Sequence, residues 1–217
     1  MRENTSMRVI RVAILVSGRG RNLQAIIDEV ESGTVPAEIV VVISDNHKAP
    51  ALERARRHGL ATVFLDPKSV TDTAHPRQAY DRKLLQALNG YQAELVILAG
   101  YMRIVSSVLL DAYALRMMNI HPSLLPSFPG LRAQQQALDH GVRVSGCTVH
   151  FVTEGVDEGP IILQRAVPVH EGDTVETLSE RILNEECRLL PQAIRLFAEG
   201  RLHVTGGAVH IRAGKLA

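Results

Sequence analysis

The segment NIHPSLLPSFPG, residues 119–130, combines side chains that can do chemistry with residues that end regular structure. Asn119 can donate an amide hydrogen to a developing oxyanion, and His121 can do the same or carry a proton. The segment also contains three prolines, Pro122, Pro126 and Pro129. Because proline fixes φ and has no backbone donor, the segment predicts an ordered, non-repetitive loop that presents Asn119 and His121 rigidly.

Asp157, in the glycine-rich turn EGVDEGP, is a candidate partner for His121. A carboxylate beside the imidazole would favour its charged form. Sequence spacing alone does not bring the two together. Asp157 as an ordinary turn aspartate, and His121 as a histidine bonded to its own loop, remain open alternatives.

A glycine turn, SGRGRN at residues 17–22, lies between a predicted first strand and first helix. Such a turn aims backbone N–H groups and the positive end of the helix dipole at an anion. The dinucleotide fingerprint would need a third glycine where Leu23 stands, and the Gly-Lys-Ser/Thr of a Walker motif is absent. The turn therefore favours a monophosphate over NAD or ATP; the alternative is a tight turn with solvent-exposed arginines.

Glu186 falls within the apolar stripe of a long predicted helix. The stripe consists of Val175, Leu178, Ile182 and Leu189. An unpaired buried charge is very costly, so Glu186 either pairs with a core arginine or receives a cationic or amino group of a ligand.

Five further residues are weaker candidates. Arg77 begins the third helix or contacts an acid, and Met102 follows a parallel strand at the end where open α/β sheets bind ligands. Core packing is the alternative for Met102, as it is for Ile104. His150 is typical of a satisfied strand histidine, and Asp45 would matter mainly for a dinucleotide.

The elements that must position these residues form an α/β pattern. Buried strands are predicted at residues 9–16, 38–43, 61–65 and 94–99, each followed by a helical pattern, the third at about Gln78 to Leu88. This alternation predicts a mostly parallel, twisted sheet with helices on both faces.

The second half of the chain changes character. MMNI leads into the proline loop, LRAQQQALDHG predicts a helix, and CTVHFVT and PIILQRAVPV predict a hairpin-like pair that extends the sheet. Asp173 and Glu176 have capping-box spacing at the start of a long helix that we expect to be broken or kinked near Pro191. The tail RLHVTGGAVHIR predicts a small peripheral hairpin about Gly206 and Gly207.

Composition bounds the class of protein. The chain has 217 residues, 46% of them hydrophobic, a formal net charge of +1, 4% aromatic residues and no tryptophan. These values fit one globular domain and disfavour a nucleic-acid partner. Cys147 and Cys187 lie far apart without zinc spacing, which fits a reducing cytoplasm. The start MRENTSMRV lacks the apolar region of a signal peptide, and no apolar run approaches membrane-spanning length.

Five segments together resemble the folate-dependent formyltransferase family: SGRGRN, AGYMRIVS, NIHPSLLPSFPG, TVHFV and EGVDEGP. The resemblance runs from Arg8 to Leu202 and is strongest to the members that formylate glycinamide ribonucleotide in purine biosynthesis. It implies a Rossmann-like single domain over residues 1–217, with a phosphate-binding half at about 8–112, a catalytic and folate half at about 113–202, and a tail at 203–217. It also implies 10-formyltetrahydrofolate as co-substrate, no metal, and a cytoplasmic monomer or homodimer without nucleic-acid or membrane partners.

The resemblance assigns roles to individual residues. It implies that the ribonucleotide phosphate is held by Gly20, Arg21 and Asn22, and its glycine amine by Glu186. The positions that match folate contacts are Arg77, Met102, Arg103, Ile104, Val105 and Asn119, and the catalytic positions are Asn119, His121 and Asp157. Two residues depart from the family pattern: Arg21 stands where a small Ser or Thr is usual, and Arg132 where a histidine is common.

The resemblance also implies a mechanism. The neutral amine of the glycinamide attacks the formyl carbon, and the oxyanion is stabilised by Asn119 and a protonated His121 beside Asp157. No covalent enzyme intermediate is required, because the amine is itself a competent nucleophile.

The sequence leaves four alternatives to this function. A formyltetrahydrofolate hydrolase is expected to carry an extra domain before the first strand, and a methionyl-tRNA formyltransferase a further C-terminal domain and a different sequence after the proline loop. A phosphate-ligand binding module gains nothing from Asn119, His121 and Asp157 occurring together. A dinucleotide-dependent dehydrogenase is disfavoured by Leu23.

Overall fold

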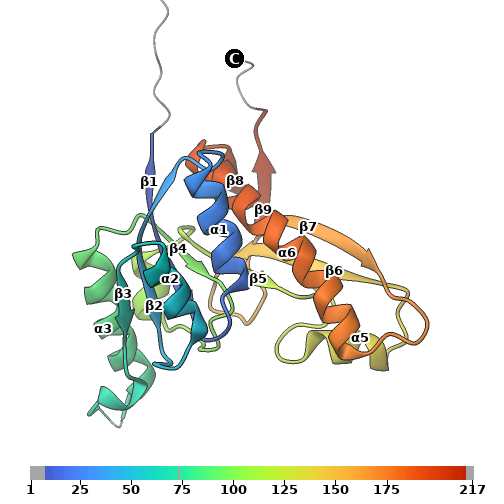
Figure 1. Ribbon diagram of the computed structural model, residues 1–217, viewed down its shortest axis with the longest axis horizontal. Helices are drawn as coiled ribbons and strands as arrows, with labels where there is room; N and C mark the ends of the chain where they lie inside the picture. Colours follow the sequence, from blue (N-terminus) through green and yellow to red (C-terminus); the bar gives the residue numbers. More distant parts are fainter. Residues whose placement is uncertain (1–7, 73, 214–217) are drawn as a thin grey trace, which may run out of the picture.

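The computed structural model describes residues 8–72 and 74–213, and a seven-stranded sheet organises them (Figure 1). Its strands are β1 (Ile10–Val16), β2 (Ala37–Ser44), β3 (Thr62–Phe64), β4 (Leu95–Leu98), β5 (Met117–His121), β6 (Val144–Phe151) and β7 (Ile161–Pro168). The spatial order is β3-β2-β1-β4-β5-β6-β7. The first five strands pair in parallel, and β6 and β7 add to the edge in antiparallel fashion. The predicted mostly parallel α/β sheet and its hairpin-like extension are confirmed.

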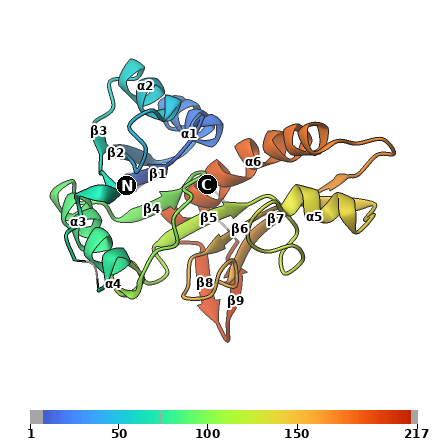
Figure 2. The same ribbon diagram turned by 90° about the horizontal axis from the view of Figure 1, so that it is seen from below.

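Helices cover both faces of this sheet. They are α1 (Arg21–Glu31), α2 (Pro50–Arg57), α3 (Pro76–Gly90), α4 (Ser107–Ala112), α5 (Ala133–Asp139) and α6 (Val175–Ala198), with a short 3-10 helix at Pro67–Ser69. Residues of α1, α2, α5 and α6 share one hydrophobic core with one face of the strands, and α3 and α4 pack in a second core on the other. Figure 2 shows α1 and α2 on the opposite side of the sheet from α3 and α4. Strands covered on both faces explain the nearly continuous apolar runs of β1, β2 and β4.

The long helix α6 differs from the sequence prediction at its start and near Pro191. The capping box is formed by Thr174 and Thr177, not by Asp173 and Glu176: the Thr174 side chain accepts from Thr177 N, and the Thr177 hydroxyl accepts from Thr174 N. Asp173 instead binds Arg181, with an ion pair of 2.7 Å. Threonine hydroxyls satisfy the first amides, so the acidic pair one residue earlier is not needed.

Of the predicted break or kink at Pro191, the break is wrong, because α6 continues through the proline to Ala198. Leu189 and Leu190 before it and Ile194 after it are all buried in the same core. Burial of apolar side chains on both sides of Pro191 outweighs the one backbone hydrogen bond that proline removes.

The tail forms the predicted small hairpin, β8 (Leu202–Thr205) and β9 (Ala208–Ile211), with Gly206 and Gly207 in the turn. Residues 1–7, on which most of the signal-peptide expectation rests, lie outside the described residues, as do 214–217. None of the helices in the described part of the chain is both long and apolar enough to span a membrane.

The topology places the chemistry at one edge of the sheet. The carboxyl ends of β1, β4 and β5 meet there, next to the switch from parallel to antiparallel pairing, where open α/β sheets bind ligands. The antiparallel pairing of β5 with β6 sets Asn119 directly opposite His150. The glycine turn follows β1 and the proline loop follows β5 at this edge, and Asp157 of the turn between β6 and β7 reaches Asn119 there.

Candidate active site

A cavity of about 510 Å³ lies at this edge, and the predicted catalytic residues are part of its wall. Asn119 and His121 come from the end of β5, and Asp157 comes from the turn between β6 and β7. The remaining wall includes residues 100–105, 130–134 and 152–156. The fold therefore brings Asn119, His121 and Asp157 together around one cavity.

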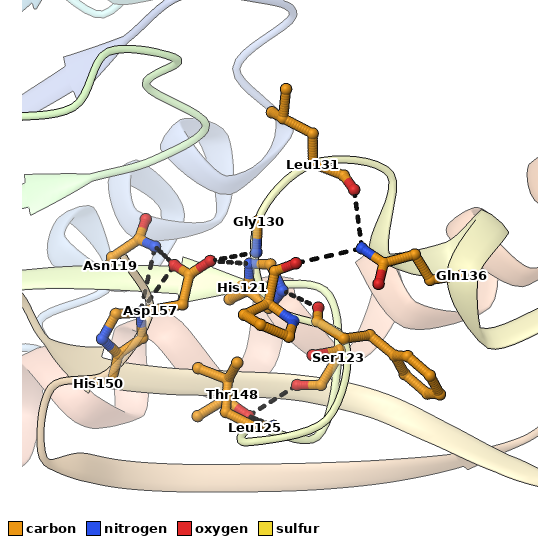
Figure 3. Close-up of polar contacts among 12 residues, drawn as sticks. Asn119, His121, Ser123, Leu125, Gly130, Leu131, Gln136, Thr148, His150 and Asp157 are labelled. Atoms are coloured by element: carbon orange, nitrogen blue, oxygen red, sulfur yellow. Dashed lines mark hydrogen bonds and ion pairs between the residues drawn. The ribbon is translucent and has the colours of Figure 1, made fainter. Parts of the chain in front are cut away.

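His121 is buried, and both of its ring nitrogens face oxygen atoms (Figure 3). Nε2 donates to the carbonyl oxygen of Phe128 at 2.8 Å, and Nδ1 lies 3.2 Å from Asp157 Oδ2. A neutral imidazole has one N–H donor, whereas an imidazolium can donate to both oxygens. The two contacts thus suit the protonated form of His121.

Asp157 connects three parts of the site. Its Oδ2 accepts a hydrogen bond from Gly130 N at 2.8 Å, and its Oδ1 accepts one from Asn119 Nδ2 at 3.4 Å. The side chain is only 10% exposed. Burial raises the pKa of the Asp157 carboxyl, but contact with His150, the Gly130 N–H and the charge of His121 outweigh it and hold that pKa below its usual value. Asp157 is therefore a carboxylate poised to stabilise a positive charge on His121.

Asn119 and His150 form the remaining contact of this group. Asn119 Nδ2 lies 3.2 Å from His150 Nε2, which is itself 3.5 Å from Asp157 Oδ1. His150 is buried, and its Nδ1 donates to the carbonyl oxygen of Phe151 at 2.9 Å. In the neutral ring with its hydrogen on Nδ1, Nε2 accepts the Asn119 amide hydrogen and so orients the amide group. In the protonated ring, Nε2 donates to Asp157 instead. Sequence reasoning treated His150 as an ordinary strand histidine, yet it touches two of the three predicted catalytic residues.

The proline loop after His121 is held by polar contacts with the antiparallel strands. Leu125 N donates to Thr148 Oγ1 at 3.0 Å, and the Thr148 hydroxyl donates to Ser123 O at 2.7 Å. Gln164 Nε2 donates to Leu125 O at 2.8 Å. These bonds fix a segment that has no regular backbone pairing of its own, as the prolines predicted.

Residues 102–105 form a wall of the cavity, as predicted, but their packing differs from the core alternative. Met102 is 68% and Ile104 51% exposed, so neither is a core residue, while Val105 is buried. The Arg103 guanidinium lies over the Tyr80 ring, 4.4 Å from its centroid. Arg77, at the exposed start of α3, does not contribute to the cavity wall.

The glycine turn forms a second group of residues, outside the cavity wall. Gly20 caps α1 with φ of 74°, and a Cβ there would lie 2.7 Å from Ala51 Cβ. Both features require glycine. The Arg21 guanidinium binds Glu180 of α6 at 2.6 Å, so this departure from the family pattern acts as a bridge between α1 and α6.

Glu186 lies in the apolar stripe of α6, buried as predicted. Its partner is not a core arginine: Asn22 Nδ2 donates to Glu186 Oε2 at 2.9 Å. Burial raises the pKa of Glu186, and the hydrogen bond from Asn22 offsets this only in part. A ligand that brings a positive charge or further hydrogen-bond donors would stabilise the ionised form of this buried carboxyl.

Within residues 8–72 and 74–213, no group of three or more His, Cys, Asp or Glu side chains is arranged to hold a metal ion. The polar groups around the cavity instead form a network of hydrogen-bond donors about one buried carboxylate. This arrangement can stabilise an oxyanion and shuttle a proton.

Comparison with known proteins identifies the family of this chain. A formyl transferase family model matches residues 10–194. The chain belongs to the formyl transferase family. The resemblance seen in the sequence motifs is thereby confirmed, since the matched residues include β1, the proline loop and most of α6.

This formyl transferase is 41% identical over 207 residues to the phosphoribosylglycinamide formyltransferase of Escherichia coli (strain K12), covering 95% of this chain and 96% of the relative. It is 46% identical over 194 residues to the trifunctional purine biosynthetic protein adenosine-3 of Bos taurus, but spans only 19% of that relative's length. The crystal structure of glycinamide ribonucleotide transformylase 1 from Symbiobacterium toebii superposes with a TM-score of 0.91 at 58% identity, covering 94% of each chain.

Proposed function

We propose that this formyl transferase moves the formyl group of 10-formyltetrahydrofolate to the amine of glycinamide ribonucleotide, a step of purine biosynthesis. Similarity over nearly the full length of single-function relatives supports this acceptor. The observation that carries the proposed chemistry is the meeting of Asn119, His121 and Asp157 on one cavity wall, each within 3.4 Å of another member of the group.

The proposed reaction is a direct acyl transfer. The amine nitrogen forms a bond to the formyl carbon, and the carbonyl oxygen becomes an oxyanion. Asn119 Nδ2 and the imidazolium of His121 donate hydrogen bonds to this oxyanion, each in exchange for one of the acceptors that it has in the free protein. Asp157 holds the charge on His121. The tetrahedral intermediate then collapses: the bond to the folate nitrogen breaks, and the proton lost by the amine moves to that nitrogen through water. Because these donors already lie on the cavity wall, each needs only to exchange one acceptor when the charge develops.

The cavity is the proposed folate site. Its volume of about 510 Å³ lies within the range of small-molecule pockets. Exposed Met102 and Ile104 offer apolar surface to an aromatic ring system, and Arg103, with Arg77 at the start of α3, supplies positive charge for the folate carboxylates. Asn119 serves both as a folate contact and as an oxyanion donor.

Gly20, Arg21 and Asn22 of the glycine turn, together with Glu186, are the proposed ribonucleotide site. The backbone N–H groups at Gly20, Arg21 and Asn22 begin α1, where the helix dipole favours a phosphate. Glu186, hydrogen-bonded to Asn22, is the proposed partner of the glycine amine. We further propose that the enzyme acts in the cytoplasm without a metal, as a monomer or homodimer.

An absorbance assay of folate release tests the proposal. The protein is mixed with 10-formyl folate with and without glycinamide ribonucleotide, and the deformylated product is followed. Release only in the presence of the ribonucleotide is expected. Release without it would favour a hydrolase, in which water replaces the amine, and no release in either reaction would favour a binding module or another amine acceptor.

A further inference from the structure

Ser17, the residue that follows β1, makes side-chain contacts with two distant segments. Its hydroxyl donates to Asp45 Oδ1 at 2.7 Å, and its oxygen accepts a hydrogen bond from Met102 N at 3.0 Å. The hydroxyl has one hydrogen to donate, so the bond to Asp45 fixes its orientation and points a lone pair at Met102. Asp45 thus has a hydrogen-bond partner within the protein, the Ser17 hydroxyl, and its position needs no bound dinucleotide to explain it.

The hydrogen bond between Met102 N and the Ser17 hydroxyl lies just beyond the end of the backbone pairing of β1 with β4. Ala99 N donates to Leu15 O at 2.9 Å, and Ser17 N donates to Gly100 O at 3.2 Å. Gly100 has φ of 74°, a left-handed conformation that turns the chain away from the sheet. Beyond that turn the Ser17 side chain, instead of a strand carbonyl, accepts the Met102 N–H.

The other end of the cavity wall is also anchored. Asp81 Oδ2 accepts hydrogen bonds from Ser106 N at 2.5 Å and from the Ser106 hydroxyl at 2.7 Å. Between these anchors the Met102 and Ile104 side chains are more than half exposed, so packing contributes little to holding them. The two polar anchors therefore hold this wall together with buried Val105 and the contact of Arg103 with Tyr80.

We propose that Ser17 is a positioning residue for the formyl folate: its hydroxyl, oriented by Asp45, holds the Met102 backbone and so preforms the wall of the cavity at residues 102–105. The folate part of this inference rests on the proposed function. The tether between Ser17 and Met102 is a property of the free protein. Preforming this wall lowers the ordering cost that folate binding would otherwise carry.

Hydrogen exchange and steady-state kinetics on the full chain test the proposal together. The variant Ser17→Ala removes the hydroxyl, Ser17→Thr retains it, and Ser32→Ala is a matched control, because Ser32 bonds only at the exposed end of α1. In Ser17→Ala we expect faster amide exchange in the peptide containing Met102 and a KM for formyl folate about 3- to 10-fold higher. The kcat value and the KM for glycinamide ribonucleotide are expected to stay within about twofold of wild type. Ser17→Thr should restore both the exchange rate and the folate KM, and Ser32→Ala should change neither.

Two outcomes would overturn the proposal. Unchanged exchange at Met102 in Ser17→Ala would show that the hydroxyl does not hold this wall, and equal increases in both KM values would show a general structural role. A wild-type protein inactive with formyl folate would overturn the proposed function and the folate assignment with it, while the exchange data would still decide on the tether. Asp45→Ala should act in the same direction as Ser17→Ala, and the double variant should be no worse than the more affected single variant, because both changes remove one tether.

Discussion

His121 Nδ1 lies 3.2 Å from Asp157 Oδ2, although 36 residues separate the two in sequence, and His121 Nε2 is bonded to a carbonyl oxygen of its own loop. The carboxylate and the carbonyl hold the ring in one orientation, since each can accept a hydrogen bond from one of its nitrogens. In the proposed reaction, an imidazolium held in this way would donate to the oxyanion in exchange for the Phe128 carbonyl, without turning out of the cavity wall.

Replacement of His121 by alanine should therefore affect turnover far more than binding. We expect kcat to fall by about 10² to 10⁴ while the KM values for both substrates stay near wild type. Steady-state kinetics measure this directly. His170→Ala, which changes an exposed histidine outside the cavity wall, serves as the control; near-normal kcat in His121→Ala would refute a catalytic role.

His150 should contribute to turnover by orienting the Asn119 amide. Replacing His150 by alanine removes the acceptor that orients the Asn119 amide, and a buried donor left without its partner costs about 1–3 kcal/mol. We expect about a 10-fold loss of kcat. His150→Gln, whose side-chain oxygen can accept the same hydrogen, should recover part of the loss. Equal kcat values for His150→Ala and wild type would return His150 to a purely structural role.

The lowered pKa of Asp157 makes a prediction about stability and pH. A carboxyl whose pKa is lower in the folded protein contributes stability above the pKa of the unfolded chain, about 3.9, and loses it as the pH falls through the folded value. Asp157→Asn should therefore be less stable than wild type at pH 7, and the difference should shrink below about pH 4. Urea unfolding at several pH values measures it. A difference that stays constant from pH 7 to pH 3 would show that the Asp157 charge does not contribute.

The apolar runs predicted the sheet because strands buried on both faces leave a clear pattern, and β1, β2 and β4 match the predicted ranges within a residue or two. The prediction failed where tertiary packing or local hydroxyls decide the outcome. Pro191 stays within α6 because the core holds both sides of it, and Thr174 takes the capping role assigned to its acidic neighbour.

The sequence predicted candidate residues for the site, but it did not predict which of them contact one another. The helical stripe correctly indicated that Glu186 is buried, yet its partner Asn22 lies 164 residues away and is brought close only by the packing of α1 on α6. His150 was missed as a site residue because its role follows from strand register: a pairing of β5 with β6 that sets it opposite Asn119. The TVHFV motif was the one signal in the sequence that pointed to this strand.

Gly20 should tolerate no side chain. Its φ of 74° is unfavourable for alanine, and the added Cβ would lie 2.7 Å from Ala51 Cβ, so Gly20→Ala should lower the free energy of unfolding by about 2–3 kcal/mol. Gly33→Ala is a matched control, since Gly33 has φ of 77° but no heavy atom within 4 Å of the added Cβ, and should lose only about 1–2 kcal/mol. Chemical denaturation compares the two. Equal losses would mean that α2 moves to accommodate the methyl group at little cost.

Glu186 should lower the stability of the ligand-free protein at neutral pH and contribute to the binding of glycinamide ribonucleotide. Its raised pKa means that the ligand-free protein is most stable while Glu186 is protonated, and that this stability is lost as the pH rises through the folded pKa. Glu186→Gln keeps the shape and can still accept from Asn22, but cannot ionise, so its stability relative to wild type should increase from pH 5 to pH 8.

The same variant should raise the KM for glycinamide ribonucleotide about 10-fold, because a neutral amide binds an amine more weakly than a carboxylate does. Glu185→Gln, on the neighbouring position of α6 and paired with Arg188, is the control and should show neither effect. An unchanged KM for the ribonucleotide in Glu186→Gln, measured beside the expected shift in stability, would assign Glu186 to the protein core alone.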